Sequence, residues 1–322
     1  MTVVLQKAVT PAQVQAFLNE GFDRIGGYMV RAGEVSDVTA VADLRRLHHT
    51  DYEGSPFAGD GPLHILHVDR SPSWQLVPAS KMVERDVMST SGTVEVNEQL
   101  VEVLFLDHTR LTNGARLWRF EEGETPVLVA TYLGPAYGWQ DHSAGGALKT
   151  GTPYPSTGAL AVVEEKAFVA DVISGDDGVP TSITAVAAVD PGGDLGFSQN
   201  DVGLWVRAFE HAELSALFEL RVTATWNDLP VLVVQVFRMP DGSRAQRIFS
   251  IARDWERARA AGLTELELGV WEANVSADEV TNVGPQEVAA QPWMTEKQKE
   301  RVAKAQAASR QNVLKDGAGA GG

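Results

Sequence analysis

Three strand-like segments joined by two short turns constrain the fold of this chain more than any other part of the sequence. LFELRVTATW (217–226) alternates apolar and polar residues, whereas VLVVQVF (231–237) is almost continuously apolar, and RAQRIFSI (244–251) follows. The turns between them contain Asn227-Asp228-Leu229-Pro230 and Pro240-Asp241-Gly242. Turns this short connect antiparallel neighbours, because a parallel connection needs a dozen residues or more. The block therefore predicts an antiparallel sheet with a buried central strand.

The rest of the chain repeats this pattern around a few short helices. Further strands are predicted at 28–31, 63–69, 100–106, 115–121, 126–133, 182–189 and 265–275, and 159–173 fits either a strand or a helix. Helices are predicted after Thr10, with Gln13 completing a capping box, and over 37–47, 202–209, 255–261 and about 295–314. These elements indicate an α+β protein.

A Gly/Ser/Thr/Pro-rich stretch divides the strands into two groups. GWQDHSAGGALKTGTPYPSTG (138–158) has little apolar content, and 322 residues are enough for two cores. We therefore expect an N-terminal α+β domain over 1–140, a linker over 141–158 and a C-terminal α+β domain over 159–293. A helical and then disordered tail is expected over 294–322.

One phrase occurs near both ends of the chain. VRAGEVSDV (30–38) and VSADEVTNV (275–283) align without a gap, and both follow a strand that begins with glycine and contains an aromatic residue. Each copy is predicted to lead from a strand into a helical turn, with Ser276 as a helix N-cap. The match has two open explanations, a distant internal duplication and a coincidence between common residues.

Charge and composition narrow the classes of function. The 27 basic and 43 acidic residues give a net charge of −16, and 21 basic and 40 acidic residues lie in 1–293. Such a body repels nucleic acid and anionic membranes and attracts a basic protein. With no cysteine, no apolar stretch long enough to cross a bilayer and no secretory signal pattern, we expect a cytoplasmic protein.

Motifs for metals and common cofactors are absent. His64 and His67 would point to opposite faces of a strand, so they cannot coordinate the same metal ion. His48-His49 matches no metal-binding motif. The glycine pairs make neither a dinucleotide-binding fingerprint nor a Walker motif. We expect no metal and no cofactor.

One order of residues resembles the ADP-ribosyltransferases. Arg31 follows Gly-Tyr on a predicted strand, Ser89-Thr90-Ser91 comes later, and Glu102 precedes VLFLDHTR. The resemblance implies that Arg31, Ser89 and Ser91 would hold NAD and that Glu102 would stabilise a ribosyl cation. The spacing from Ser91 to Glu102 is short for that family, and Leu100 stands where its paired acidic motif begins. The structural alternative is an amphipathic strand with an outward Glu102.

A second resemblance is to β-rich domains of actinobacterial proteins whose genes neighbour secreted toxins. It rests on TATWNDLPVLVV (223–234) and AAGLTELELGVWEANVSADEV (260–280), and more faintly on GGYMVRAGEV, DYEGSPF and ARLWRF. The resemblance implies an interaction or toxin-immunity role in a bacterial cell.

Together these observations predict a non-catalytic cytoplasmic protein that binds a basic protein partner through an acidic surface. One alternative is an NAD-consuming or ADP-ribosyl-transferring enzyme in the N-terminal half. Another is a structural subunit of a larger assembly.

Overall fold

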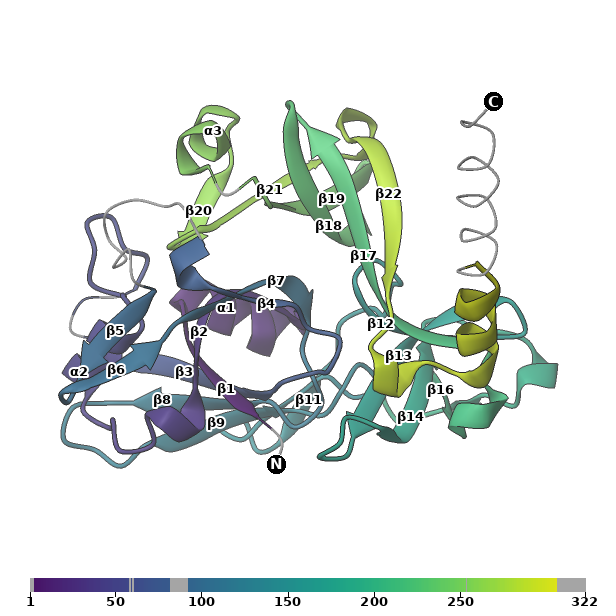
Figure 1. Cartoon of the computed structure of the whole chain (residues 1–322), viewed down its shortest axis with the longest axis horizontal. Helices are drawn as coiled ribbons and strands as arrows, with labels where there is room; N and C mark the ends of the chain where they lie inside the picture. The colour runs from purple at the N-terminus through teal and green to yellow at the C-terminus, as the bar shows by residue number, and fades with distance from the viewer. Residues whose placement is uncertain (1–2, 58, 60, 82–91, 253, 306–322) are drawn as a thin grey trace, which may run out of the picture.

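The chain folds into two large antiparallel sheets with short helices at their margins (Figure 1). A computed structural model describes residues 3–57, 59, 61–81, 92–252 and 254–305. The predicted α+β class with two β-rich domains and short helices is confirmed.

The first sheet has nine strands in the order β11-β10-β9-β8-β3-β1-β2-β7-β4. They are β1 (Val4–Val9), β2 (Arg24–Arg31), β3 (Leu63–Asp69), β4 (Leu76–Pro78), β7 (Leu104–Arg110), β8 (Arg116–Phe120), β9 (Val127–Tyr132), β10 (Trp139–Asp141) and β11 (Ala147–Lys149). A separate hairpin is formed by β5 (Thr93–Val96) and β6 (Gln99–Glu102).

The second sheet has eleven strands in the order β15-β16-β14-β13-β12-β17-β18-β19-β21-β20, and β22 pairs with β17. They are β12 (Gly158–Val163), β13 (Lys166–Ser174), β14 (Pro180–Ala187), β15 (Ser198–Gln199), β16 (Trp205–Phe209), β17 (Ala216–Trp226), β18 (Leu229–Arg238), β19 (Arg244–Ser250), β20 (Thr264–Glu267), β21 (Val270–Ser276) and β22 (Thr281–Val288). The predicted meander 217–251 is its centre.

The helices are short. They include α1 (Pro11–Gln15), a π-helical turn η1 (Ala16–Glu20), α2 (Val41–Leu47), α3 (Trp255–Ala260) and the 3-10 turns η2 (Ala32–Glu34), η3 (Ala79–Lys81), η4 (Gly193–Leu195), η5 (His211–Glu213), η6 (Ala277–Glu279) and η7 (Gln291–Trp293). A further helix covers 296–305 near the C-terminus. Thr10 and Gln13 form the predicted capping box of α1, and Asp254 caps α3 as predicted. None of the helices in the described part of the chain has the length and apolar character to cross a membrane.

Several element predictions were wrong. The predicted strand 100–106 is divided between β6 and β7, which belong to different sheets. The segment 159–173 is neither one strand nor a helix but the hairpin of β12 and β13. The predicted helix 202–209 is instead strand β16, because residues 205–209 pair with β14 at the margin of the second sheet. The amide of Leu204 donates to the Asn200 Oδ1 side chain, so Asn200 shapes a turn and caps no helix. The predicted strand 265–275 is two strands, because Gly269 turns the chain with a φ of 73°.

The repeated phrase forms the same local structure twice. Strand β2 ends at Arg31 and leads into the 3-10 turn Ala32–Glu34, and β21 ends at Ser276 and leads into Ala277–Glu279. The turns coincide residue for residue in the gapless alignment, and Ser276 is the N-cap of its turn, as predicted. The elements that precede the two copies are also alike. Before the first copy, the capped helix α1 lies in the chain between the antiparallel strands β1 and β2. Before the second, the capped helix α3 lies between the antiparallel strands β19 and β21.

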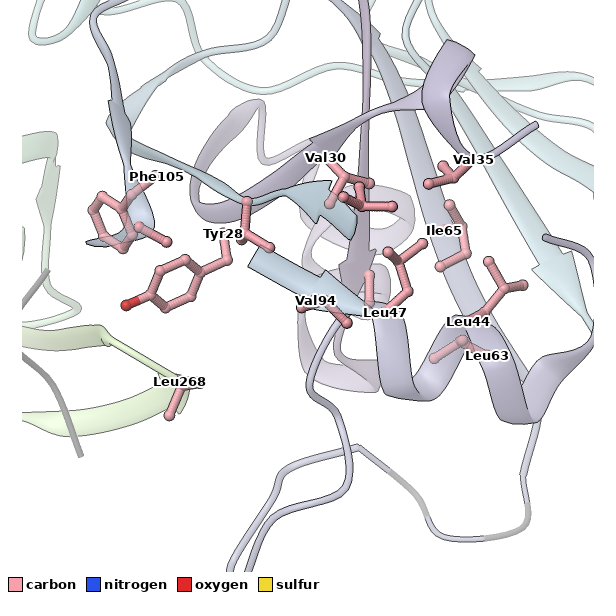
Figure 2. Packing of buried hydrophobic residues seen from close by; sticks show 14 of the residues in the cluster. Tyr28, Val30, Val35, Leu44, Leu47, Leu63, Ile65, Val94, Phe105 and Leu268 are labelled. Atoms are coloured by element: carbon pink, nitrogen blue, oxygen red, sulfur yellow. The ribbon is translucent and has the colours of Figure 1, made fainter. Parts of the chain in front are cut away.

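One hydrophobic core is shared by the two sheets. The largest buried cluster includes Tyr28 and Phe105 of the first sheet with Leu232, Phe249 and Val270 of the second. Figure 2 shows Leu268 of the second sheet beside Tyr28 and Phe105. In Figure 1 the β20–β21 end of the second sheet lies above β2 and β7. The two groups of strands therefore bury part of their apolar surface against each other.

A buried ion pair crosses the same junction. The Lys7 ammonium of β1 donates to the Glu267 carboxylate of β20, and the side chains are 1% and 7% exposed. The Gln13 amide donates to the other Glu267 oxygen at 3.0 Å. A Cβ at Gly27 would lie 2.8 Å from the Lys7 Nζ atom, so β2 approaches this pair closely only because residue 27 is glycine.

The chain crosses between the sheets through residues 150–157, inside the predicted linker 141–158. Ser156 and Thr157 are buried, and their hydroxyls donate to the carbonyls of Val234 and Val233 on β18 at 2.7 and 2.9 Å. Earlier parts of the predicted linker belong to the first sheet as β10 and β11. The crossover is thus held at both ends by the sheets it connects.

The C-terminal segment begins as a docked helix over 296–305. Thr295 and Gln298 form the predicted capping box, and the Gln298 side chain also accepts from the Leu217 amide and donates to its carbonyl. Met294 and Trp293 are buried beside it. The predicted disordered end, GAGAGG, lies outside the described residues.

Lys7→Met should lower the free energy of unfolding by about 3 kcal/mol, because it leaves the Glu267 carboxylate buried without a counter-charge. Burial already raises the pKa of Glu267 above its usual value. A raised folded-state pKa stabilises below the unfolded-state pKa and loses that contribution as pH rises, so the loss should be larger at pH 8 than at pH 5. Urea unfolding at both pH values measures it.

The matched control is Lys299→Met. Lys299 pairs with Glu296 at 2.7 Å, but both side chains are at least half exposed. Its loss should therefore change stability little. Equal effects of the two variants would mean that the buried pair does not hold the junction.

Candidate functional site

The structure brings together two residues of the predicted ADP-ribosyltransferase site, Arg31, expected to hold NAD, and Glu102, expected to stabilise the ribosyl cation. Arg31, at the end of β2, pairs with Glu102, at the end of β6, with 2.8 Å between Nη1 and Oε2. The same Arg31 atom lies 3.1 Å from the Glu34 carboxylate. Ser89 and Ser91 lie outside the described residues. The NAD site stays a prediction for which the structure supplies two of four residues.

The Arg31 guanidinium is matched by carboxylates on an open surface. The Arg31 and Glu102 side chains are 37% and 42% exposed. Partial burial lowers the pKa of Arg31, but hydrogen bonds from Glu102 and Glu34 outweigh it and the net direction is upward. Neither Arg31 nor Glu102 lines either of the two large cavities of the molecule. In this arrangement two carboxylates already compensate the charge that would attract a nucleotide phosphate.

The larger of these cavities lies between the sheets and was not predicted. Its volume is about 630 Å³, and residues before β2, in the crossover and at the turn end of the β18–β19 hairpin form its wall. We call it the arginine cavity and define it by Arg24, Arg238, Arg244, Phe22, Tyr154 and Phe237. Its wall thus combines guanidinium groups with aromatic rings.

Two buried arginines share one carboxylate beside the arginine cavity, and of the two only Arg24 lines it. Arg24 on β2 and Arg110 on β7 are cross-strand neighbours. Asp23 pairs with Arg24 through one oxygen and with Arg110 through the other, the latter at 2.9 Å. The Tyr132 hydroxyl donates to the same Asp23 oxygen as Arg110, at 3.0 Å. Asp23 is therefore shared by two buried cations, of which Arg110 is also attracted by the carboxylates of Glu219 and Asp171.

The pKa shifts of these groups show that burial disfavours their charged forms. Burial, followed by repulsion from Arg110, holds the pKa of Arg24 well below its usual value, and burial lowers the pKa of Arg110. Burial raises the pKa of Tyr132, so its hydroxyl remains a neutral donor. Within the described residues, Arg24 Nε and Arg110 Nη1 are buried without a hydrogen-bond partner. The floor of the arginine cavity is thus the Arg24 side chain, which is paired with Asp23 and keeps one unsatisfied N–H group.

A second cavity of about 390 Å³ is acidic. Arg110 also lines it, with Asp69, Asp171 and Glu219 among the acidic residues around it. Burial raises the pKa of Asp171 to about 6, although the Asn113 amide donates to its Oδ2 atom at 2.7 Å. Burial likewise raises the pKa of Glu219, whose carboxylate accepts from Ser73 and Thr109. Arg110 therefore stands between an acidic and a cationic cavity.

Exposed carboxylates gather at one end of the second sheet. The pairings Val163↔Lys166 and Ala187↔Trp205 bring the β12–β13 turn and the β14–β16 loop to the same end. The Lys166 ammonium donates to the Pro191 carbonyl at 3.2 Å, which ties the turn to the loop. We call this surface the acidic end; its carboxylates are those of Glu164, Glu165, Asp190, Asp194 and Asp201, all exposed.

The two cavities could not be predicted from sequence patterns, because both depend on the register in which distant strands pair. Arg24 and Arg110 are 86 positions apart in the chain and become neighbours only through the β2–β7 pairing. The one sequence feature that could have indicated a site is the presence of arginine at the ends of otherwise apolar strands. Across the described residues no group of three or more histidines, cysteines or acidic residues is placed to hold a metal ion.

Comparison of the chain with protein-family models, with curated proteins and with solved structures finds no match. The two resemblances noted in the sequence therefore gain no support from a relative, and function has to be argued from the residues.

Asp171→Asn should change how stability depends on pH. The raised pKa of Asp171 means that its protonated form stabilises the fold below the unfolded value and that this contribution is lost as pH rises through about 6. Asparagine can still accept from Asn113 and has no charge to bury. The unfolding free energy of the variant relative to the wild type should therefore rise between pH 4 and pH 8.

Chemical denaturation across that range measures the effect, with Asp190→Asn as an exposed control. A relative stability of Asp171→Asn that falls with rising pH would show that ionised Asp171 is favoured by the fold, contrary to the burial argument.

Proposed function

We propose that the protein binds a basic protein partner through the acidic end of its second sheet, without catalysis. The observation that favours this function is the set of five exposed carboxylates on two adjoining loops, with Lys166 as the basic residue between them. A concentrated acidic surface attracts a basic partner over a distance and speeds productive encounter. The net charge of −16 adds a weaker, diffuse attraction.

An apolar contact is available within the same surface. Val189 is 74% exposed and directly precedes Asp190. Charge attraction gives rate and orientation, whereas buried apolar contacts supply most of the lasting affinity. An exposed valine bordered by carboxylates therefore suits a partner that has an apolar side chain among basic residues.

The cell compartment and the kind of partner are part of this proposal. The chain has no cysteine, so its fold needs no disulfide and is compatible with a reducing cytoplasm. The resemblance to domains encoded beside secreted toxins suggests a bacterial toxin as the basic partner and an immunity role for this chain. We favour binding over ADP-ribosyl transfer because Glu34 and Glu102 already occupy the Arg31 guanidinium.

The test compares two sets of neutralised carboxylates that change net charge equally. The first set is Glu164→Gln, Glu165→Gln, Asp190→Asn, Asp194→Asn and Asp201→Asn at the acidic end. The control set is Asp51→Asn, Glu53→Gln, Glu122→Gln, Glu124→Gln and Glu256→Gln, all exposed elsewhere. Stopped-flow kinetics follow association with cytochrome c as a generic basic protein, and with a toxin where a toxin gene lies beside the gene for this chain.

The acidic-end variant should associate with the basic protein more slowly than the control variant, toward the uncharged range of about 10⁵–10⁶ M⁻¹s⁻¹. The difference should shrink toward about 0.5 M salt, where charges are screened within a few ångströms. Equal rates for both variants at low salt would leave only the diffuse net charge and would contradict a binding surface at the acidic end.

A further inference from the structure

Two pairs of like-charged neighbours supply the arginines of the arginine cavity: Arg24, Arg238 and Arg244 line it, and Arg110 lines the acidic cavity. Arg238 and Arg244 are directly opposite each other on β18 and β19, just as Arg24 and Arg110 are on β2 and β7. Like charges directly opposite on neighbouring strands destabilise a sheet. Two such pairs beside one cavity indicate that something other than stability is gained from the four arginines.

The positive charge along the cavity wall exceeds the negative charge by one. The acidic residues that line the cavity are Asp23 and Glu20, against the guanidinium groups of Arg24, Arg238 and Arg244. Asp23 is already shared between Arg24 and Arg110. In a protein with a net charge of −16, this local excess of positive charge runs against the composition of the whole chain.

The two pairs offer different kinds of contact. Arg24 is buried in the cavity wall and paired with Asp23, whereas Arg110, its cross-strand neighbour, lines the acidic cavity. Arg238 and Arg244 are exposed at the rim, where Arg238 donates to the Gly242 carbonyl at 3.4 Å. A fixed arginine in the floor and two movable arginines at the rim together suit an anion that enters from solvent.

Aromatic side chains border the same space. Tyr154 is 41% exposed, and its carbonyl oxygen accepts from Arg110 at 3.4 Å, which fixes the backbone of this residue beside the floor. Phe237 and Phe22 also line the cavity. An exposed ring beside guanidinium groups favours a ligand that joins a planar group to its negative charge.

We propose that the arginine cavity binds a phosphate monoester that carries a planar ring. A phosphate monoester has a charge of about −1.5 to −2 at pH 7, opposite to that of the three lining arginines, and its oxygens accept the paired N–H groups of guanidinium. The volume of about 630 Å³ holds a ring and a phosphate together. The ligand is bound at the junction of the sheets, away from the acidic end.

Isothermal titration calorimetry with phenyl phosphate tests this site, alongside inorganic phosphate and phenol as its separate halves. The wild type should bind phenyl phosphate more tightly than inorganic phosphate, and phenol least. Arg238→Gln/Arg244→Gln should weaken the Kd for phenyl phosphate by at least about tenfold, because it removes charge-assisted hydrogen bonds at an exposed rim. Arg46→Gln/Arg259→Gln, an exposed pair elsewhere, should leave the Kd unchanged.

Two further measurements separate the site from general charge effects. Tyr154→Ala should remove the preference for phenyl phosphate over inorganic phosphate while inorganic phosphate still binds. Without ligand, Arg238→Gln/Arg244→Gln should raise the melting temperature, since the like-charge repulsion is gone. The proposal is overturned if phenyl phosphate does not bind the wild type at millimolar concentration, or if both arginine double variants weaken it equally.

Discussion

The buried ion pair between Lys7 and Glu267 is the interaction on which the arrangement of the two sheets depends. The residues are 260 positions apart, so their contact ties the first strand of the chain to one near its end. Removing either charge from water costs several kcal/mol, and only the partner charge with the Gln13 amide offsets it. The two sheets can therefore pack only where these groups meet, and the absence of a side chain at Gly27 leaves room for that meeting.

From this constraint follows the position of both cavities. Once β1 and β20 are fixed against each other, β7 contacts both β12 and β18 of the second sheet. The crossover is then held against β18 by Ser156 and Thr157. Arg110, on β7, lies at the centre of this junction and lines the acidic cavity while sharing Asp23 with Arg24 of the arginine cavity. Charges that a separate domain would expose are here held between two domains.

Local signals in the sequence predicted local structure well. Alternation of apolar residues gave the strands around 217–251, and the capping residues Thr10, Asp254 and Ser276 gave the starts of three helical turns. The repeated phrase gave two matching turns because its shared residues fall at the same positions of both. These features depend on contacts between residues close in the chain.

Long-range pairing could not be predicted in the same way. Residues 202–209 have a helical spacing of apolar side chains, yet pairing with β14 makes a strand there. Nothing in the sequence says that Arg24 will face Arg110 or that Lys7 will find Glu267, because one residue of register slip would move each side chain to the opposite face. In the predicted ADP-ribosyltransferase site, the pairing of Arg31 with Glu102 likewise depends on how β2 and β6 come together.

Native-state hydrogen exchange tests most directly the claim that the junction makes the two sheets one cooperative body. The slowest amides of β1, β2 and β7 should open with the same free energy and the same denaturant dependence as those of β18, β19 and β21. If one sheet exchanges through a separate opening of clearly lower free energy while the other stays protected, the sheets are independent and the buried pair between Lys7 and Glu267 does not unite them.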